Sequence, residues 1–330
     1  MRLVQLMHRD GRRRVAVADG AWMRLVDGAS TIYGLAQSAI ARGVRLRAAV
    51  ALSGERQSYD DAYEGRGDWR LLPPVDHPEE PARCYITGTG LTHKASALNR
   101  NAMHEQTGAE TDSMKMFRWG LEGGRPAEGA AGTAPEWFYK GNGLILRGHG
   151  DALESPAFAE DGGEEPEIAG VYLIDSTGAP RRLGLTQGNE FSDHKFEKRN
   201  YLYLAHSKLR MCALGPELAV DPDFSGDVRG VVSVERGGSV LWQRAIQSGE
   251  ANMCHTVANL EHHHFKYALH RRPGDVHVHY FGADGFSFGE GITLQDGDVM
   301  QVAFDGFGRP LRNALRAGAP GEKLMAARAL

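Results

Sequence analysis

The chain has 330 residues, and its 38 Lys and Arg against 42 Asp and Glu give a formal net charge of −4, which excludes a general electrostatic attraction to nucleic acid or to an anionic membrane surface. Its three cysteines, Cys84, Cys212 and Cys254, are far apart and show no Cys-x-x-Cys spacing, which argues against a disulfide framework or a zinc knuckle. No run approaches the ~20 apolar residues of a membrane span and the N-terminus soon turns polar, so we expect a cytoplasmic protein.

Residues 1–80 are predicted to form a small α/β domain. Strand-like pieces within residues 2–26 surround a turn signal at Arg9-Asp-Gly-Arg12. Ser30-Thr31 can cap a helix whose apolar spacing continues to Gly43. The four prolines within residues 71–83 indicate a connector, so we place a domain boundary near residue 80 and a second domain at 81–330.

Three acids in the middle of the chain are predicted to form a metal site. Glu165 and Glu167 lie two apart at the start of an apolar run, and a strand places residues i and i+2 on one face. The turn residues at 175–180 and the run that follows predict a returning strand, which brings Glu190 beside the pair. An all-oxygen ligand set favours Mg²⁺, with Mn²⁺ or Ca²⁺ less favoured, and disfavours zinc. The alternative is a solvated acidic loop at 162–165.

Six histidines lie between His262 and His279 and suggest a zinc or copper site, which we exclude. The segment is predicted to continue a helix that begins near Asn252 and is stopped by Pro273-Gly-Asp275. Three successive helical residues point about 100° apart, so His262, His263 and His264 cannot all bind one ion. A structural role is expected for this segment.

The acidic motifs resemble those of the fumarylacetoacetate hydrolase superfamily, and most closely its sugar-acid branch. Glu165-Pro-Glu167 matches the Glu-x-Glu pair of that superfamily, and Gly188-Asn-Glu190-Phe-Ser192 matches its later acid, with Glu in place of the usual Asp. The resemblance covers residues 84–313. It implies an α+β fold, in which a mixed β-sheet roll forms the catalytic domain after a small N-terminal domain, and it implies a homodimer.

The resemblance also assigns two catalytic residues. Lys208 matches the lysine that follows the metal acid, which implies a base or a charge partner, although a lysine is more often a solvated charge. His93, in Thr87-Gly-Thr-Gly-Leu-Thr-His93, matches the histidine of a mobile acid/base pair, and we expect it to act as the acid. The family's Glu three residues later is replaced by Ser96, and Glu105 is a candidate substitute from a later turn.

Three further residues are candidates for binding the substrate. Lys140 matches a pocket-lining lysine and could meet a substrate carboxylate, although it could equally end a strand at the surface. Arg118 is suited to bind a carboxylate through two hydrogen bonds, but packing explains its neighbours equally well. His279 occupies the position at which the family usually has a substrate-contacting Thr, so the polar end of the ligand could be recognised differently here.

These motifs predict an enzyme that acts on a 2-keto acid. Mg²⁺ can hold the carboxylate and keto oxygens of such an acid and stabilise the charge that develops when C3 loses a proton. Ser96, in place of a water-activating Glu, and the sugar-acid resemblance favour a dehydratase over a hydrolase. We expect conversion of 2-keto-3-deoxypentonate to 2,5-dioxopentanoate in non-phosphorylative pentose catabolism. The alternatives are a metal-dependent C–C hydrolase that releases pyruvate from a 2,4-dioxo acid, and a non-catalytic sugar-acid-binding protein.

Overall fold

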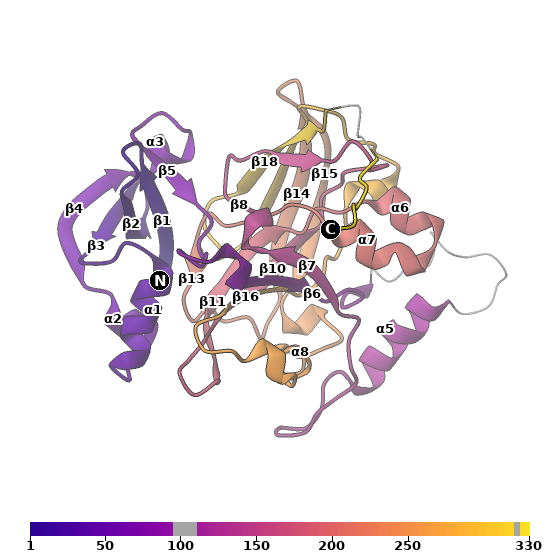
Figure 1. The fold of residues 1–330 in the computed structure, drawn as a ribbon, viewed down its shortest axis with the longest axis horizontal. Helices are drawn as coiled ribbons and strands as arrows, with labels where there is room; N and C mark the ends of the chain where they lie inside the picture. The colour runs from indigo at the N-terminus through magenta and orange to yellow at the C-terminus, as the bar shows by residue number, and fades with distance from the viewer. Residues whose placement is uncertain (95–110, 320–323) are drawn as a thin grey trace.

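The fold is built mainly from strands (Figure 1). The computed structural model describes residues 1–94, 111–319 and 324–330. In the first part of the chain the strands are β1 (Arg2–His8), β2 (Arg13–Asp19), β3 (Trp22–Val26), β4 (Leu52–Ser58), β5 (Trp69–Leu72), β6 (Cys84–Gly88), β7 (Phe138–Asn142), β8 (Leu146–Arg147) and β9 (Leu153–Ser155). In the second part they are β10 (Pro166–Ile174), β11 (Pro180–Asn189), β12 (Cys212–Leu214), β13 (Leu218–Ala219), β14 (Val228–Arg236), β15 (Ser239–Ser248), β16 (Val276–Tyr280), β17 (Val299–Phe304) and β18 (Leu311–Ala317).

Helices are short and lie around the sheets. They are α1 (Ile32–Ala41), α2 (Leu46–Ala49), α3 (Tyr59–Tyr63), α5 (Asp112–Gly123), α6 (His194–Arg199), α7 (Leu204–Lys208) and α8 (Val257–Phe265), with 3-10 turns η1 (Pro81–Arg83), η2 (Gly143–Ile145), η3 (Tyr201–Tyr203), η4 (Glu250–Asn252), η5 (Ala268–His270) and η6 (Ser287–Glu290). No helix in the described ranges is long and apolar enough to cross a membrane.

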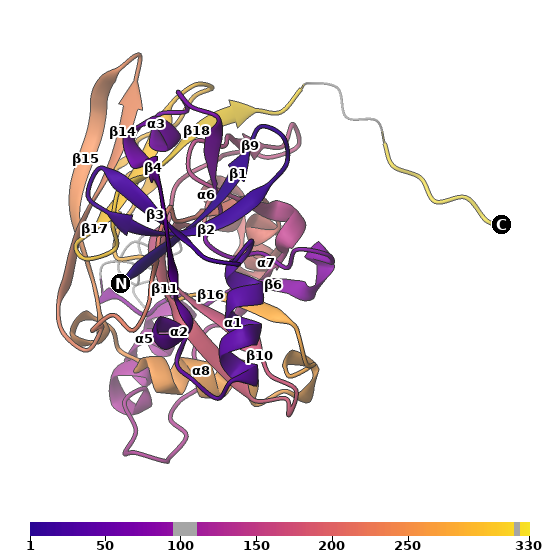
Figure 2. The ribbon, with the colours of Figure 1, turned by 90° about the vertical axis from the view of Figure 1, so that its left-hand side faces the viewer.

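Two sheets organise the residues that the structure describes. The larger has 13 strands, and its main path runs β4-β3-β2-β1-β13-β11-β10-β16-β6-β7. The smaller has five strands in the order β15-β14-β17-β18-β9. Figure 2 shows β14 and β15 as a long hairpin along one side of the molecule. Parallel and antiparallel pairs occur in both sheets, as the β6–β16 and β9–β18 pairs show, so the sheets are mixed.

The first 80 residues fold as their local sequence predicts. The backbone N–H of Gly11 bonds the carbonyl of His8 in the turn between β1 and β2. The side chain of Thr31 accepts a hydrogen bond from the N–H of Gly34 at 3.0 Å and caps α1. The apolar face of α1, which includes Leu35, is buried in the core. Both the hairpin and the helix predicted from the sequence are therefore confirmed.

The large sheet continues across the predicted domain boundary. β1 pairs antiparallel with β13, with Arg2 opposite Ala219 and Leu3 opposite Leu218. Leu3 and Leu218 lie fully buried in the same hydrophobic cluster. The division near residue 80 stays a prediction, and in this structure the two parts share one sheet and part of one core.

The β10–β11 hairpin positions the acidic residues. Every residue of β10 is buried, which explains its continuous apolar run. Asp175 closes the turn, since its Oδ1 accepts from the N–H groups of Thr177 and Ala179 at 2.9 and 3.0 Å. In the pairing, Glu167 lies opposite Gly188, so the start of β10 meets the end of β11. The returning strand predicted from the sequence is confirmed.

The helix expected from Asn252 onward is shorter than predicted. α8 begins only at Val257, because Thr256 caps it by accepting from the N–H of Asn259 at 3.1 Å. It ends at Phe265, well before Pro273. The prediction was wrong about both ends of the helix.

Candidate metal and catalytic site

Glu165, Glu167 and Glu190 converge at the joined ends of β10 and β11. All three side chains are buried, and each offers a carboxylate oxygen that lies within 4.8 Å of those of the other two. The N–H of Glu190 also bonds the backbone carbonyl of Glu165 at 2.9 Å, which fixes the spacing of these two acids. The convergence predicted from the sequence is confirmed, and the alternative of a solvated loop is excluded.

Two buried lysines balance part of this negative charge. The Nζ of Lys208 lies 2.7 and 2.8 Å from the two carboxylate oxygens of Glu165 and 2.6 Å from Oε2 of Glu190. The Nζ of Lys140 lies 2.5 Å from Oε1 of Glu190. A buried pair needs such short contacts to offset the loss of hydration. Since three carboxylates face two ammonium groups, an excess of negative charge remains.

Glu167 is the acid whose negative charge the two lysines do not balance. Its Oε2 accepts a hydrogen bond from the N–H of Gly282 at 2.7 Å, and within the described residues it has no ion-pair partner. Burial, followed by repulsion from Glu190 and Glu165, raises the pKa of Glu167 well above its ordinary value. A buried acid in this state is suited to a cation, and three carboxylates with no sulfur or imidazole among them suit a hard ion such as Mg²⁺.

A further set of polar residues orients the acids. His194 places its Nε2 3.0 Å from Oε1 of Glu165, and its ring stacks on Phe286 with centroids 4.6 Å apart. Burial lowers the pKa of His194, but the contact with Glu165 outweighs it and the net shift is upward. The hydroxyl of Ser192 donates to Oε2 of Glu190 at 2.9 Å. Such second contacts fix the orientation of ligating groups.

Sequence reasoning did not assign His194 a role. It lies in the run Glu190-Phe-Ser-Asp-His194, directly after the third acid, and this closeness was the available signal. Glu164 was also not assigned. Its carboxylate accepts from the N–H and the hydroxyl of Ser287 at 2.6 and 2.8 Å, which ties the loop after β16 to the site.

Lys140 lies in the site, but its ammonium group is fully engaged by the protein. Besides Glu190, its Nζ bonds the carbonyl oxygens of Phe191 at 2.8 Å and Lys208 at 3.0 Å. The ammonium group thus donates two hydrogen bonds to backbone carbonyl oxygens and forms an ion pair with Glu190. In this structure Lys140 holds the third acid, rather than presenting a donor to a substrate carboxylate as expected.

Arg118 is not brought to the acids. It lies on α5, which Figure 1 shows at the edge of the molecule, and its side chain is 46% exposed. Its Nη1 pairs with Glu122 at 3.1 Å, one helical turn further on. Its substrate-binding role stays a prediction that nothing in this arrangement supports.

His279 is buried in β16, and both of its ring nitrogens are engaged. Nδ1 lies 2.8 Å from the hydroxyl of Thr87 and Nε2 lies 2.7 Å from that of Thr89. Its ring stacks on His264 of α8, at 4.7 Å between centroids. Successive strand residues point to opposite faces, and it is the neighbouring Tyr280 whose pKa is raised by burial and, to a smaller extent, by Glu190 and Glu167. The substrate role of His279 stays a prediction, and the structure shows packing contacts.

His93 lies in the loop after β6 and is almost fully buried. Its Nδ1 lies 2.8 Å from the hydroxyl of Thr92, and burial lowers its pKa to about 4. Its Nε2 has no hydrogen-bond partner among the described residues. Ser96 and Glu105, the replaced residue and the candidate substitute, lie outside the described ranges.

Glu136 is a buried carboxylate that sequence reasoning missed. The hydroxyl of Tyr201 donates to its Oε1 at 2.8 Å. Burial alternates along this segment, so Glu136, Phe138 and Lys140 share one face. The Phe138 ring lies 4.9 Å from the Nζ of Lys208. Glu136 therefore lies on the same face of this segment as the residues that contact the acids. The alternation, visible in the sequence as Glu-Trp-Phe-Tyr-Lys, was the available signal.

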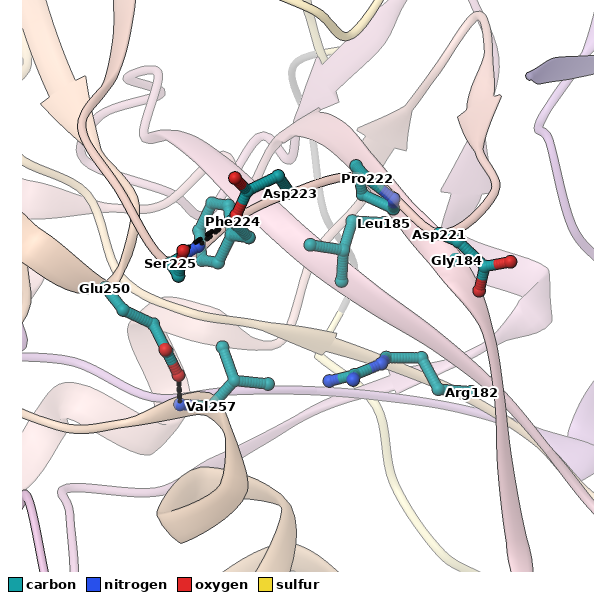
Figure 3. Close-up of a pocket in the computed structure, with 10 residues that line it drawn as sticks. All are labelled: Arg182, Gly184, Leu185, Asp221, Pro222, Asp223, Phe224, Ser225, Glu250 and Val257. Carbon is teal, nitrogen blue, oxygen red and sulfur yellow. Dashed lines mark hydrogen bonds between the residues drawn. The ribbon is translucent and has the colours of Figure 1, made fainter.

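A hollow elsewhere on the surface is separate from the three acids. This hollow has a volume of about 320 Å³, and Figure 3 shows the residues that line it, which include Arg182, Asp221 and Glu250. None of the three acids lines it. The hollow is therefore a different feature of the surface.

Comparisons with known proteins agree on one fold. No family model matches the chain. A probable 2-keto-3-deoxyxylonate dehydratase of Haloferax volcanii is 26% identical over 279 residues, which are 82% of this chain and 83% of the relative. The solved structure of a 2-keto-3-deoxy-D-arabinonate dehydratase in its apo form matches with a TM-score of 0.70 at 20% identity, over 97% of this chain and 100% of that chain.

Two further solved structures extend this likeness. A 2-keto-3-deoxy-D-arabinonate dehydratase complexed with magnesium and 2,5-dioxopentanoate matches with a TM-score of 0.70 at 19% identity, over 96% of this chain and 99% of that chain. A 5-carboxymethyl-2-hydroxymuconate delta-isomerase from Mycobacterium smegmatis matches with a TM-score of 0.59 at 18% identity, over 96% of this chain and 100% of that chain. The chain shares the fold of these solved structures, which agrees with the resemblance of its acidic motifs to the fumarylacetoacetate hydrolase superfamily. The α+β fold expected of this superfamily is confirmed.

The superfamily that the acidic motifs resemble usually has Asp at the position of Glu190. The structure shows how the longer side chain is accommodated. Its two oxygens are held apart by different partners, Lys140 on Oε1 and Lys208 with Ser192 on Oε2. The carboxylate of Glu190 therefore keeps a fixed orientation despite the extra methylene.

Proposed function

We propose that this protein is a Mg²⁺-dependent dehydratase that converts a 2-keto-3-deoxypentonate into 2,5-dioxopentanoate and water. The observation that carries the proposal is the buried triad of Glu165, Glu167 and Glu190, in which Glu167 makes no ion pair with any residue that the structure describes. The same fold occurs in a dehydratase structure complexed with magnesium and 2,5-dioxopentanoate. The relative from Haloferax volcanii is named as a probable 2-keto-3-deoxyxylonate dehydratase, which is an enzyme of the same reaction type.

The three acids are the residues that would hold Mg²⁺. When bound, the ion supplies positive charge beside the carboxylate and keto oxygens of a 2-keto acid, where negative charge develops as C3 loses its proton. Mn²⁺ and Ca²⁺ accept the same all-oxygen ligands, and we propose Mg²⁺ as the physiological ion.

The two lysines hold the carboxylates of Glu165 and Glu190 in place. Lys208 contacts both Glu165 and Glu190, and Lys140 contacts Glu190 from the other side. The acids are therefore held in place before an ion binds, which lowers the cost of ordering them on binding. We propose that Lys208 acts mainly as a charge partner, because its Nζ is already close to three carboxylate oxygens.

Dehydration also needs proton transfer, because C3 loses a proton and C4 loses a hydroxyl group. Lys208 and His93 are the predicted catalytic residues. The ammonium of Lys208 is engaged by Glu165 and Glu190, whereas Nε2 of His93 has no partner among the described residues. His93 is thus the better candidate for a group that exchanges protons with the substrate.

The reaction can be tested directly. The purified protein, loaded with Mg²⁺, is incubated with 2-keto-3-deoxy-D-arabinonate or 2-keto-3-deoxy-D-xylonate, and separately with a 2,4-dioxo acid, while NMR follows the products. We expect 2,5-dioxopentanoate from a keto-deoxy acid, and no product after EDTA treatment. Pyruvate from the 2,4-dioxo acid alone would indicate a hydrolase, and tight binding without turnover would indicate a binding protein; either result overturns the proposal.

We also propose that the protein is a cytoplasmic homodimer, as the resemblance implies. Light scattering of the purified protein at several concentrations tests the assembly, and a monomer at all of them would contradict it.

A further inference from the structure

We infer that Thr92 is a positioning residue that fixes one neutral tautomer of His93, with the proton on Nδ1 and a free electron pair on Nε2. His93 then accepts a proton from the substrate, whereas the sequence led us to expect it to act as the acid. The catalytic part of this inference rests on the proposed function, but the tautomer itself does not.

The single proton of the Thr92 hydroxyl decides the tautomer. The Oγ1 of Thr92 lies 2.6 Å from the carbonyl oxygen of Phe281, which can only accept a hydrogen bond. The hydroxyl proton therefore points to that oxygen. Since Oγ1 also lies 2.8 Å from Nδ1 of His93, it must accept there, and Nδ1 must carry the proton. In a neutral ring Nε2 is then unprotonated.

Burial keeps the ring of His93 neutral. The side chain is only 1% exposed, and no charged group in the described residues opposes the effect of burial on it. A buried nitrogen without a partner is uncommon in folded proteins, because the lost hydrogen bond costs free energy. Such atoms are more often found at functional sites, where a ligand completes the bond.

The same hydroxyl connects His93 to the metal acids. The peptide group between Phe281 and Gly282 accepts from Thr92 through its carbonyl oxygen and donates to Oε2 of Glu167 through its N–H at 2.7 Å. Thr92 thus places His93 at one end of a short chain of hydrogen bonds that has Glu167 at the other end. The peptide group between Phe281 and Gly282 therefore fixes the position of the imidazole relative to Glu167.

Gly282 is required for this arrangement. A Cβ at this position would lie 2.1 Å from Oγ1 of Thr92, and the residue has a φ of +97°. Any other residue would push the hydroxyl away and would strain the backbone. The glycine therefore permits the close approach on which the tautomer depends.

The proposed step balances in protons and electrons. The C3–H bond breaks, its proton binds Nε2 of His93, and the electron pair stays on the substrate. That pair forms the C3–C4 double bond as the C4–O bond breaks, and the departing hydroxide takes the proton from Nε2 to give water. The enone that results, 5-hydroxy-2-oxopent-3-enoate, becomes 2,5-dioxopentanoate by tautomerisation, in which C5 and its hydroxyl group each lose a proton and C3 and C4 each gain one. His93 ends the cycle in the same neutral tautomer, which Thr92 restores.

The tautomer can be measured without a substrate. The full-length protein, labelled with ¹⁵N-histidine and loaded with Mg²⁺, is examined by NMR at pH 7, where a nitrogen that carries a proton and one that does not have different shifts; the His93→Gln variant assigns the signal. We expect Nδ1 to be protonated and Nε2 to be bare. A protonated Nε2 in the wild-type protein overturns the inference, whether or not the protein proves to be a dehydratase.

Variants of Thr92 test its effect on turnover. Thr92→Val should lose the fixed tautomer and lower kcat/KM by about 10²-fold, the usual contribution of a positioned base, and should change the acid limb of the pH profile. Thr92→Ser keeps a hydroxyl and should restore both. Thr186→Val is a matched control, since Thr186 is also buried and donates to a backbone carbonyl, that of Glu217 at 2.9 Å, without a histidine partner. Wild-type tautomer and activity in Thr92→Val, or an equal loss in Thr186→Val, would refute the role.

Discussion

The ammonium of Lys208 lies 2.7 and 2.8 Å from the two carboxylate oxygens of Glu165, although the two residues are 43 positions apart in the chain. It also contacts Glu190, so one cation joins two of the three acids. A buried cluster of this kind depends on every member, because removal of one leaves its partners charged and without compensation.

We predict that Lys208→Met lowers the free energy of unfolding of the metal-free protein by about 3–5 kcal/mol, since Glu165 and Glu190 then lose the buried ammonium group that joins them. Saturating Mg²⁺ should restore more stability in this variant than in the wild type, because the ion replaces the missing charge. Denaturant titrations with and without Mg²⁺ measure both effects. Lys195→Met, at an exposed position on α6, is the control and should change neither. Unchanged unfolding of Lys208→Met would contradict the prediction.

Glu167→Gln should have the opposite effect on the metal-free protein. Glu167 has no ion-pair partner among the described residues, and its pKa is raised by burial and by the two other acids. Neutralising it should increase the stability of the metal-free protein, because the repulsion from Glu190 and Glu165 is then removed. Mg²⁺ at 100 times its Kd should stabilise the wild type by about 2.7 kcal/mol, and this gain should disappear in the variant.

Thermal unfolding and calorimetric titration of Glu167→Gln check these two expectations. Glu79→Gln, at an exposed position, serves as the control variant. Wild-type Mg²⁺ affinity in Glu167→Gln would exclude this acid as a ligand.

Lys140→Met distinguishes two roles of this lysine. If Lys140 holds Glu190, as its three contacts indicate, the variant loses about 3–5 kcal/mol of stability and becomes much less active. If it binds the substrate carboxylate, KM should rise while the unfolding midpoint stays unchanged. We expect the first result. Steady-state kinetics and urea unfolding of the same preparation separate the two.

Acid should destabilise the protein through its buried histidines. Burial is the main cause that lowers the pKa of five of them, to about 4 or about 3; they are His93, His149, His255, His277 and His279. Because the unfolded chain has the ordinary value near 6.5, it binds protons first as the pH falls. The stability from these neutral rings is complete above pH 6.5 and is lost progressively toward pH 4 and 3.

Each such histidine contributes a loss of up to about 1.4 kcal/mol per pH unit in this range. Urea unfolding of the metal-free protein at pH 7.5 and pH 5.5 should therefore show a clearly lower midpoint at pH 5.5. The raised pKa of Glu167 acts in the opposite direction, since protonation relieves its repulsion, so Glu167→Gln should make the dependence steeper. A midpoint that does not fall between these pH values would contradict the prediction.

The convergence of the acids could be predicted because local rules determine it. Alternation in a strand, a turn closed by Asp175 and an apolar return strand together bring Glu190 to Glu165 and Glu167. The partners of the lysines could not be predicted in this way. The contacts of Lys140 with the carbonyl oxygens of Phe191 and Lys208 depend on tertiary packing that no periodicity in the sequence encodes.

The contacts of His279 also could not be predicted from the sequence. A period of two in β16 indicates that His277 and His279 share a face, but it does not say whether that face meets the acids or α8. The structure shows that it meets α8, through His264. The tautomer of His93 also depends on a carbonyl that lies 189 positions away from Thr92 in the chain.

Because β1 pairs with β13, the N-terminal segment covers an edge of the large sheet. Without residues 1–80, the backbone N–H and C=O groups of β13 would become an open edge, and unprotected edges recruit other chains into intermolecular sheets. A trimmed, minimal version of this enzyme should therefore aggregate during expression, and insertions or fusions at the N-terminus should be tolerated only if they leave this strand free to dock.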